Sequence, residues 1–270
     1  MKTRIIAAAV LVPVLFLLTL VVPKIVAALV FGVLLAIGVY ELLYRTGLVR
    51  HVRMVIYSAI AAFGISVWSY YDSIHAYLLL GMVIFCMLLF MEVMIDHVKV
   101  QVELVGLCIL AGFVVPYMLC AFIRILATSN GRYFILLPFT IGFLSDAGAY
   151  FVGLRFGHHK LAPVVSPNKT IEGMFGGLAF AVVGSVIYGL ILRFALHFQV
   201  NFGLAVLYGL IGSLAGVVGD LIFSVIKRQT GIKDYGNLIP GHGGFLDRFD
   251  SLVMVAPLIE ALLLLCPMAV

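Results

Sequence analysis

The sequence GDLIFSVIKRQTGIKDYGNLIPGHGGFLDRFDS, residues 219–251, concentrates charge in a chain that carries little of it elsewhere. Its acids and bases are Asp220, Asp234, Asp247 and Asp250, and Lys227, Arg228, Lys233 and Arg248. Apolar runs long enough to cross a bilayer lie on both sides. Charged residues beside such runs are costly unless they are paired or hydrated, and they usually mark a functional site. We therefore expect this stretch to carry the chemistry of the protein.

The spacing of these residues groups several of them together. Asp220, Ser224 and Lys227 are separated by four and three positions, so they share one face of a helix. Asp247 and Asp250, three positions apart, share a face of the next helix. Each group alone has a simpler interpretation, because bases anchor helix ends at the membrane surface and acids favour first helical turns. The two groups together favour a site.

The segment between these two helices is rich in glycine and proline, which disfavours a helix there. His242, Gly243 and Gly244 lie in its tightest part. A glycine loop that leads into a helix start presents free backbone N–H groups, and these bind phosphate oxygens well. Carboxylates, cations and such a loop together predict a site for a divalent cation and a polyphosphate.

The same residues resemble the signature of a known family. The pattern consists of Ser224-x-Ile226-Lys227-Arg228, Lys233-Asp234 and Pro240-x-His242-Gly243-Gly244-Phe245-x-Asp247-Arg248-Phe249-Asp250. It is similar to the signature of the phosphatidate cytidylyltransferase (CDP-diacylglycerol synthase) family and departs from it at no position. The pattern is long and its spacing is fixed, although it covers only about an eighth of the chain.

The resemblance implies an enzyme that transfers the cytidylyl group of CTP to phosphatidic acid, giving CDP-diacylglycerol and pyrophosphate for phospholipid biosynthesis. The expected catalytic residues are Asp220, Lys227, Asp247 and Asp250, of which the three aspartates would hold Mg²⁺ or two cations. The expected substrate-binding residues are Asp146, Lys169, Glu172, Ser224, Arg228, Lys233, His242, Gly243, Gly244 and Arg248. The resemblance also implies a homodimer.

A second informative stretch, residues 145–173, reads SDAGAYFVGLRFGHHKLAPVVSPNKTIEG. Asp146, Tyr150, Gly153 and Gly157 recur at helical spacing, which predicts a face where another helix of this chain or of a second copy packs closely. The run from Ser166 to Gly173 resembles a second, weaker segment of the same family. That likeness is what places Asp146, Lys169 and Glu172 near the nucleotide.

The composition indicates an integral membrane protein. The chain has 270 residues, 64% hydrophobic and 11% charged, and its mean hydropathy is +1.22. Such values exclude a soluble domain. The four cysteines lie in apolar segments without CxxC spacing, which argues against a disulfide framework or a zinc site. The pI of about 9.0 reflects basic cytoplasmic loops and anionic lipid, so we expect membrane lipids and no nucleic acid as partners.

The apolar runs predict an all-α, polytopic fold in a single membrane domain, 1–270. Helices up to about residue 130 would form a scaffold, and 131–270 the catalytic half. The first run is longer than a signal-peptide core and leads directly into the second, so we interpret it as a retained helix. The nine expected spans are 5–22, 25–43, 54–70, 76–95, 103–123, 133–153, 174–196, 203–226 and 246–266.

The distribution of lysine and arginine predicts the orientation. Of the 17 basic residues, only Lys24, Arg124, Arg132 and Arg193 fall on the side opposite the N-terminus. The positive-inside rule therefore places the N-terminus and both candidate site loops in the cytoplasm, for a protein of the cell (plasma) membrane. For the carboxylates inside the helices, Glu41, Glu92 and Glu260, we expect structural pairing.

Three other functions fit part of the pattern. A CTP-dependent lipid kinase would use a related membrane fold but would yield CDP instead of pyrophosphate. A CDP-alcohol phosphotransferase is disfavoured because its aspartate motif, DG…AR…G…D…D, is absent. A cation-coupled transporter would also carry intramembrane carboxylates, but such sites lie near the bilayer midplane on broken helices with internal repeats, and this chain shows no repeat.

Overall fold

The computed structural model describes residues 13, 15–71, 75–238 and 243–269. The chain divides into two compact units. The first consists of Met1–Ser129 and Gln229–Phe249, and the second of Asn130–Arg228 and Asp250–Val270. One boundary lies near residue 130, but the division of the chain into a scaffold and a catalytic half stays a prediction. Residues 229–249, which we expected in the catalytic half, belong with the first unit.

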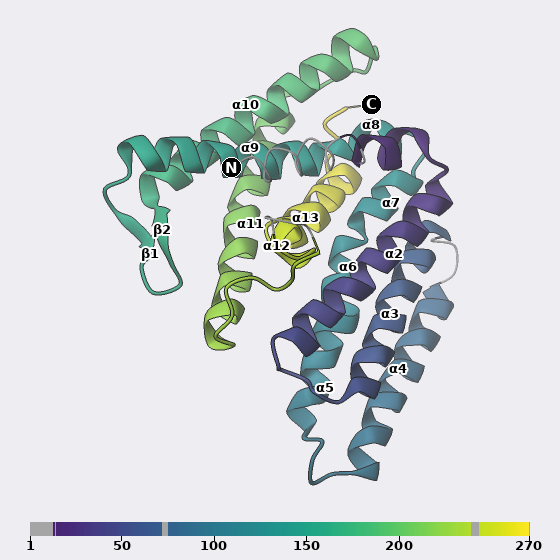
Figure 1. Cartoon of the computed structure of the whole chain (residues 1–270). Coiled ribbons are helices and arrows are strands. Elements are labelled where there is room, and N and C mark those ends of the chain that lie inside the picture. The colour runs from purple at the N-terminus through teal and green to yellow at the C-terminus, as the bar shows by residue number, and fades with distance from the viewer. Residues whose placement is uncertain (1–12, 14, 72–74, 239–242, 270) are drawn as a thin grey trace. The chain divides into compact units, whose positions relative to one another are not determined.

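The first unit is a group of long apolar helices (Figure 1). After a turn of π-helix, η1 (Leu17–Val21), its elements are α2 (Lys24–Tyr40) with the π-helical turn η2 (Glu41–Arg45), α3 (Val52–Tyr71), α4 (His75–Ile95), α5 (Val102–Ile109), η3 (Leu110–Val114), α6 (Val115–Leu119), α7 (Ala121–Ala127) and the short α12 (Leu246–Phe249). Helix α3 packs against both α2 and α4. The rings of Phe31, Phe122, Phe245 and Phe249 contact one another, and the Phe245 and Phe249 rings stack with centroids 4.4 Å apart. This aromatic cluster is what holds α12 on the helices of the first unit.

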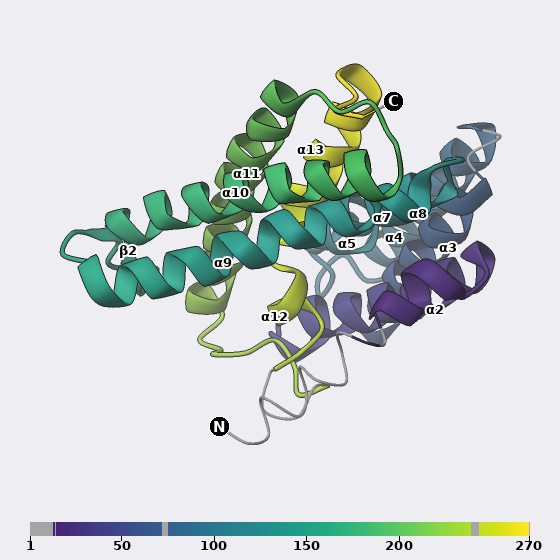
Figure 2. The ribbon, with the colours of Figure 1, turned by 90° about the horizontal axis from the view of Figure 1, so that it is seen from above.

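The second unit contains α8 (Gly131–Phe134), α9 (Leu136–Phe156), β1 (Lys160–Ala162), β2 (Ser166–Thr170), α10 (Ile171–Ala195), α11 (Phe202–Gln229) and α13 (Leu252–Leu265). Helices α9 and α10 run side by side in both Figure 1 and Figure 2. The antiparallel strands β1 and β2 form a hairpin between them. The hydroxyls of Ser145 and Ser213 hydrogen-bond across the buried interior at 2.7 Å.

The expected small-residue face of α9 is used within the chain. A Cβ on Gly153 would lie 3.0 Å from Thr170 Oγ1 and 3.5 Å from the Cα of Gly173 at the start of α10. Close approach of this kind is what glycine faces permit in membrane helices. The interpretation was incomplete, however, because the Tyr150 side chain is 63% exposed and takes no part in the contact.

Seven helices among the described residues have the length and composition of membrane spans, and each overlaps one of the expected spans. Half of the expected span 5–22, residues 5–12 and 14, lies outside the described residues. The expected span 246–266 is divided at Asp250–Ser251, and its apolar part, α13, has 14 residues. At 1.5 Å per residue α13 is about 21 Å long, short of a bilayer core of about 30 Å. The all-α membrane class is thus confirmed, while the count of nine spans stays a prediction.

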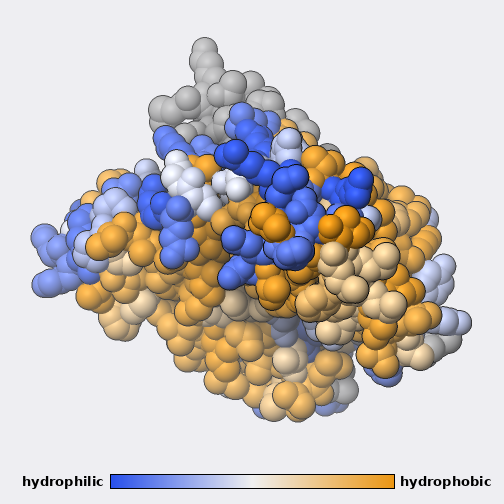
Figure 3. Space-filling view, turned by 90° about the horizontal axis from the view of Figure 1, so that it is seen from below, coloured by the Kyte–Doolittle hydropathy of each residue, from blue (hydrophilic) through white to orange (hydrophobic). Residues whose placement is uncertain are grey.

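The surface agrees with a bilayer environment. Large hydrophobic side chains are exposed along the long helices, such as Met94 and Leu154 at 81% and 75% exposure. Figure 3 shows hydrophobic residues over a large part of one face. Exposed apolar area of this extent is rare on water-soluble monomers, so these helices are built to contact lipid or another apolar surface.

Candidate functional site

The second unit brings together five of the predicted site residues, which we call the aspartate–lysine cluster: Lys169, Asp220, Ser224, Lys227 and Asp250. Lys169, at the end of β2, forms an ion pair with Asp220 on α11. Ser224 Oγ donates to Asp220 Oδ1 at 3.2 Å. Lys227 Nζ lies 3.7 Å from Asp250 Oδ2, and both side chains are largely buried. The predicted common face of Asp220 and Ser224 is therefore confirmed by a direct bond.

The negative charges of neighbouring aspartates affect the pKa of Asp250. Asp250 lies outside the seven membrane-length helices. Burial raises the pKa of Asp250 to about 7; the negative charge of Asp220 adds to this effect, and Lys227 opposes it. Asp146 on α9 raises the pKa of Asp250 further. Excess negative charge in a partly desolvated place favours a bound cation, since a cation stabilises the ionised carboxylates.

The second unit supplies two of the three aspartates that we expected to hold Mg²⁺, and these two fit that ion. Among the described residues, no three or more His, Cys, Asp or Glu side chains are arranged to hold a metal ion by themselves. Mg²⁺ does not require such a cage, because it typically takes one or two carboxylates together with substrate phosphates and retained waters. Asp220 and Asp250 supply two carboxylates of this kind.

The hairpin β1–β2 is held by two residues that we expected at the nucleotide. The carboxylate of Glu172, in the first turn of α10, accepts the backbone N–H groups of His158 at 3.1 Å and His159 at 3.2 Å. Its other oxygen lies 2.6 Å from His159 Nδ1. Arg228 Nε donates to the carbonyl of Val165 in the hairpin turn at 3.1 Å. Both residues thus fix the hairpin whose last residues present Lys169.

The first unit holds the glycine-rich end of the signature. Asp247 is buried, and its Oδ2 accepts the backbone N–H of Tyr235 at 2.8 Å and of Gly244 at 2.9 Å. Gly243 has φ +88°, a conformation that L-residues rarely adopt, and a Cβ there would lie 2.8 Å from Asp247 Oδ2. Asp247 therefore stabilises the backbone at Tyr235 and at Gly244 by accepting their N–H groups.

Glu41 is a buried residue that the sequence reasoning did not include in the site. Its Oε1 accepts the N–H of Phe245 at 3.1 Å, and its Oε2 accepts that of Leu246 at 3.0 Å. These N–H groups begin α12 and have no partner within the helix, so the carboxylate satisfies them. The expectation of structural pairing is confirmed for Glu41. It is also confirmed for Glu92, which accepts from Tyr57 Oη at 3.1 Å.

The other predicted residues lie as follows. Lys233 and Arg248 are exposed in the first unit. His242 lies outside the described residues. Because Asp220 and Asp250 belong to the second unit and Asp247 to the first, a metal site that includes all three aspartates stays a prediction.

Comparisons with known proteins identify the family of the chain. A model of the cytidylyltransferase family matches residues 2–266. The phosphatidate cytidylyltransferase of Staphylococcus haemolyticus (strain JCSC1435) is 46% identical over 151 residues, which is 56% of this chain and 56% of that protein. The protein of the same name from Staphylococcus aureus (strain COL) is 48% identical over 136 residues, or 50% of this chain and 51% of that one. The chain thus matches about half the length of these curated relatives.

Proposed function

The chain belongs to the cytidylyltransferase family, and we propose that it transfers the cytidylyl group of CTP to phosphatidic acid. The products are CDP-diacylglycerol and pyrophosphate. The observation that supports this most is the aspartate–lysine cluster, which joins carboxylates and ammonium groups from the two segments that resemble the family signature. The names of the relatives point to the same substrates.

In the proposed reaction an oxygen of the lipid phosphate attacks the α-phosphorus of CTP. A P–O bond forms between them, and the bond from the α-phosphorus to the β-phosphate oxygen breaks, so pyrophosphate leaves with that electron pair. The lipid phosphate is already anionic at neutral pH, so no strong general base is required. What the protein must supply is alignment of the two phosphates and neutralisation of their charge.

The residues of the cluster have the chemistry for this task. The ammonium groups of Lys169 and Lys227 pair with the carboxylates of Asp220 and Asp250. On our proposal they turn to phosphate oxygens when substrates bind, and the carboxylates they leave hold Mg²⁺ or two cations. A bound Mg²⁺ supplies further charge neutralisation at the phosphates. We expect the backbone of the glycine loop at Gly243 to contact the leaving pyrophosphate as well, whereas the N–H of Gly244 is donated to Asp247.

A direct assay tests the proposed function. Purified protein is incubated with labelled CTP and phosphatidic acid, and the lipid products are separated by thin-layer chromatography. Label in CDP-diacylglycerol together with equimolar pyrophosphate is the expected result. Release of CDP and phosphorylation of an added lipid alcohol would instead assign the protein to the CTP-dependent lipid kinases. If CTP is not turned over with either lipid, both the cytidylyltransferase proposal and the lipid kinase alternative are wrong.

We predict that transfer is direct and that Ser224 is not a nucleophile. Its hydroxyl donates to Asp220, and that carboxylate is paired with Lys169, which makes it a weak general base for activating a serine. Ser224→Ala should lower kcat/KM by no more than roughly 10- to 160-fold, the loss of one hydrogen bond to a charged group of about 1.5–3 kcal/mol. The measurement is steady-state kinetics with both substrates varied, together with exchange of labelled pyrophosphate into CTP. Parallel double-reciprocal lines with exchange in the absence of lipid would reveal a cytidylyl-enzyme and contradict this prediction.

We also propose that the protein lies in the plasma membrane with its site facing the cytoplasm, and that it forms a homodimer. In a variant without the four native cysteines, single cysteines at Val165 and Gln229 should react with a membrane-impermeant thiol reagent only after the cells are opened. The reason is the excess of basic residues on that side of the predicted spans. Labelling of either position in intact cells would contradict the proposed cytoplasmic orientation of the site.

A further inference from the structure

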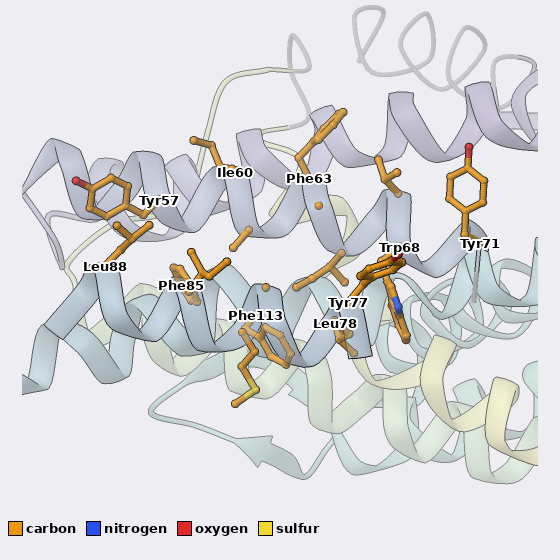
Figure 4. A pocket seen from close by; sticks show the side chains of 17 residues that line it. Tyr57, Ile60, Phe63, Trp68, Tyr71, Tyr77, Leu78, Phe85, Leu88 and Phe113 are labelled. Carbon is orange, nitrogen blue, oxygen red and sulfur yellow. The ribbon is translucent and has the colours of Figure 1, made fainter. Parts of the chain in front are cut away.

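The first unit contains an apolar cavity between α3 and α4, closed on one side by Phe113 of η3. Its volume is about 620 Å³, and its lining is almost entirely hydrophobic and aromatic. Figure 4 shows Tyr57 and Leu88 at one end and Trp68, Tyr71 and Tyr77 at the other. The cavity therefore runs along both helices within membrane-spanning segments. None of the residues assigned to the proposed reaction lines it.

Two glycines on facing helices create this space. Gly64 on α3 and Gly81 on α4 both line the cavity, and a Cβ at either position would meet no atom within 4 Å. Helix α4 is also the least covered of the seven long helices, with 11% of its apolar window buried against 39–50% in the others. The void is thus open to the surroundings of the protein rather than being a packing defect in the interior.

The dimensions of the cavity decide what can fill it. Its lining on α3 extends from Tyr57 to Tyr71, 14 residues apart, which is about 21 Å at 1.5 Å per residue. A groove of that length, lined by aliphatic and aromatic side chains, can hold an extended hydrocarbon chain. A helix of a second copy is the alternative occupant, and the test below distinguishes the two.

The charged groups near the Tyr57 end indicate which kind of lipid fits. Arg53 Nη1 lies 3.8 Å from Glu92 Oε1, and Lys99 Nζ lies 3.3 Å from Asp96 Oδ2. Two ion pairs, which together carry no net charge, therefore lie near this end. Such a set is compatible with a headgroup that carries both a phosphate and an ammonium. A phosphomonoester dianion would meet two carboxylates and gain less.

The opposite end of the cavity carries aromatic residues of the types found at membrane interfaces. Trp68 and Tyr77 belong to the residue types that gather at the interface between hydrocarbon and headgroups. An acyl chain that starts near Arg53 would thus cross the cavity and end beside these rings. Apolar clefts of about 300–1,000 Å³ with few polar groups are typical small-ligand sites.

From these observations we propose that the cavity binds one acyl chain of a zwitterionic phosphodiester lipid of the bilayer, with its headgroup at Arg53 and Glu92. The bound lipid is a resident component of the protein and is distinct from the phosphomonoester substrate. The proposal does not depend on the proposed enzymatic function, since it rests on the first unit alone.

Filling the cavity tests the proposal. Gly64→Leu and Gly81→Leu place a side chain in the void, and leucine favours a helix more than glycine does, so the fold is not at risk. Gly106→Leu on α5 is the matched control, because a Cβ there also meets no atom within 4 Å but Gly106 does not line the cavity. The full-length proteins are purified in detergent with added phosphatidylethanolamine, and the lipids retained per protein are counted by native mass spectrometry.

Wild type and Gly106→Leu are expected to retain one phosphatidylethanolamine more than either cavity variant, and added lipid should raise their Tm selectively. The KM for phosphatidic acid should be equal in all four proteins. Equal retention in all four would overturn the proposal. Preferential retention of phosphatidic acid, with a raised KM in the cavity variants, would show a substrate site instead. A loss of dimer in the cavity variants alone would show an interface between copies. Lipid counting works on inactive protein, so failure of the enzyme assay and failure of this proposal are separate results.

Discussion

Asp250→Asn is expected to lower kcat/KM for cytidylyl transfer by roughly 30- to 900-fold, equivalent to about 2–4 kcal/mol of transition-state stabilisation. The substitution keeps the shape of the side chain but removes a negative charge that acts together with Asp220. It also removes the carboxylate that pairs with Lys227. The substitution should weaken Mg²⁺ binding and displace the ammonium group of Lys227, because both depend on the negative charge of Asp250.

The measurement is steady-state kinetics at saturating Mg²⁺, with Tm as a check on folding. Asp220→Asn and Asp247→Asn should fall in the same range if all three carboxylates serve the reaction. Glu260→Gln is the control, because Glu260 lies ten positions after Asp250, about 15 Å along a helix. Near-normal turnover of Asp250→Asn would remove this residue from the proposed ligands.

Glu41→Ala is expected to destabilise the protein by about 2–6 kcal/mol. The substitution leaves the buried N–H groups of Phe245 and Leu246 without their acceptor, and each such loss costs about 1–3 kcal/mol. Glu41→Gln keeps one carbonyl oxygen and should lie between Ala and wild type. The kcat/KM for cytidylyl transfer should fall together with stability, because Phe245 and Leu246 immediately precede Asp247.

Thermal unfolding in detergent measures the first effect, and hydrogen exchange at the amides of Phe245 and Leu246 locates it. Glu103→Gln serves as the control, because Glu103 is exposed on α5 and surface changes usually stay within about 0.5 kcal/mol. A Glu41→Ala protein that melts with wild type, with both amides still protected, would refute the anchoring role.

The helical elements and part of the site could be predicted from the sequence because they are local. Spacing of four residues predicts that Asp220 and Ser224 lie one turn apart, and they are hydrogen-bonded. Seven of the apolar runs were long enough to identify as helices with correct positions. The short hairpin was missed because strands of three and five residues show no usable period. Pro163 and Pro167, which disfavour helix around them, were its only local signal.

The contacts that complete each unit could not be predicted because they join distant positions. Lys169 pairs with Asp220, 51 residues later, and Glu41 binds Phe245, 204 residues later. Neither pairing has a periodic or compositional trace in a single sequence. The division of the last predicted span at Asp250–Ser251 was missed because Asp247 and Asp250 were interpreted as acids in the first turns of one continuous helix, where acids are common.

The distance along the chain between Glu41 and its partners has a consequence for biosynthesis. At about 5–20 residues per second, a ribosome needs roughly 10–40 s to make the 204 residues that separate Glu41 from Phe245. During that interval the carboxylate at the end of α2 has no α12 to bind, and a charge left in hydrocarbon is costly. The nascent helix must therefore keep Glu41 at the hydrated membrane surface or protonated. The first unit is then completed only after nearly the whole protein has been inserted.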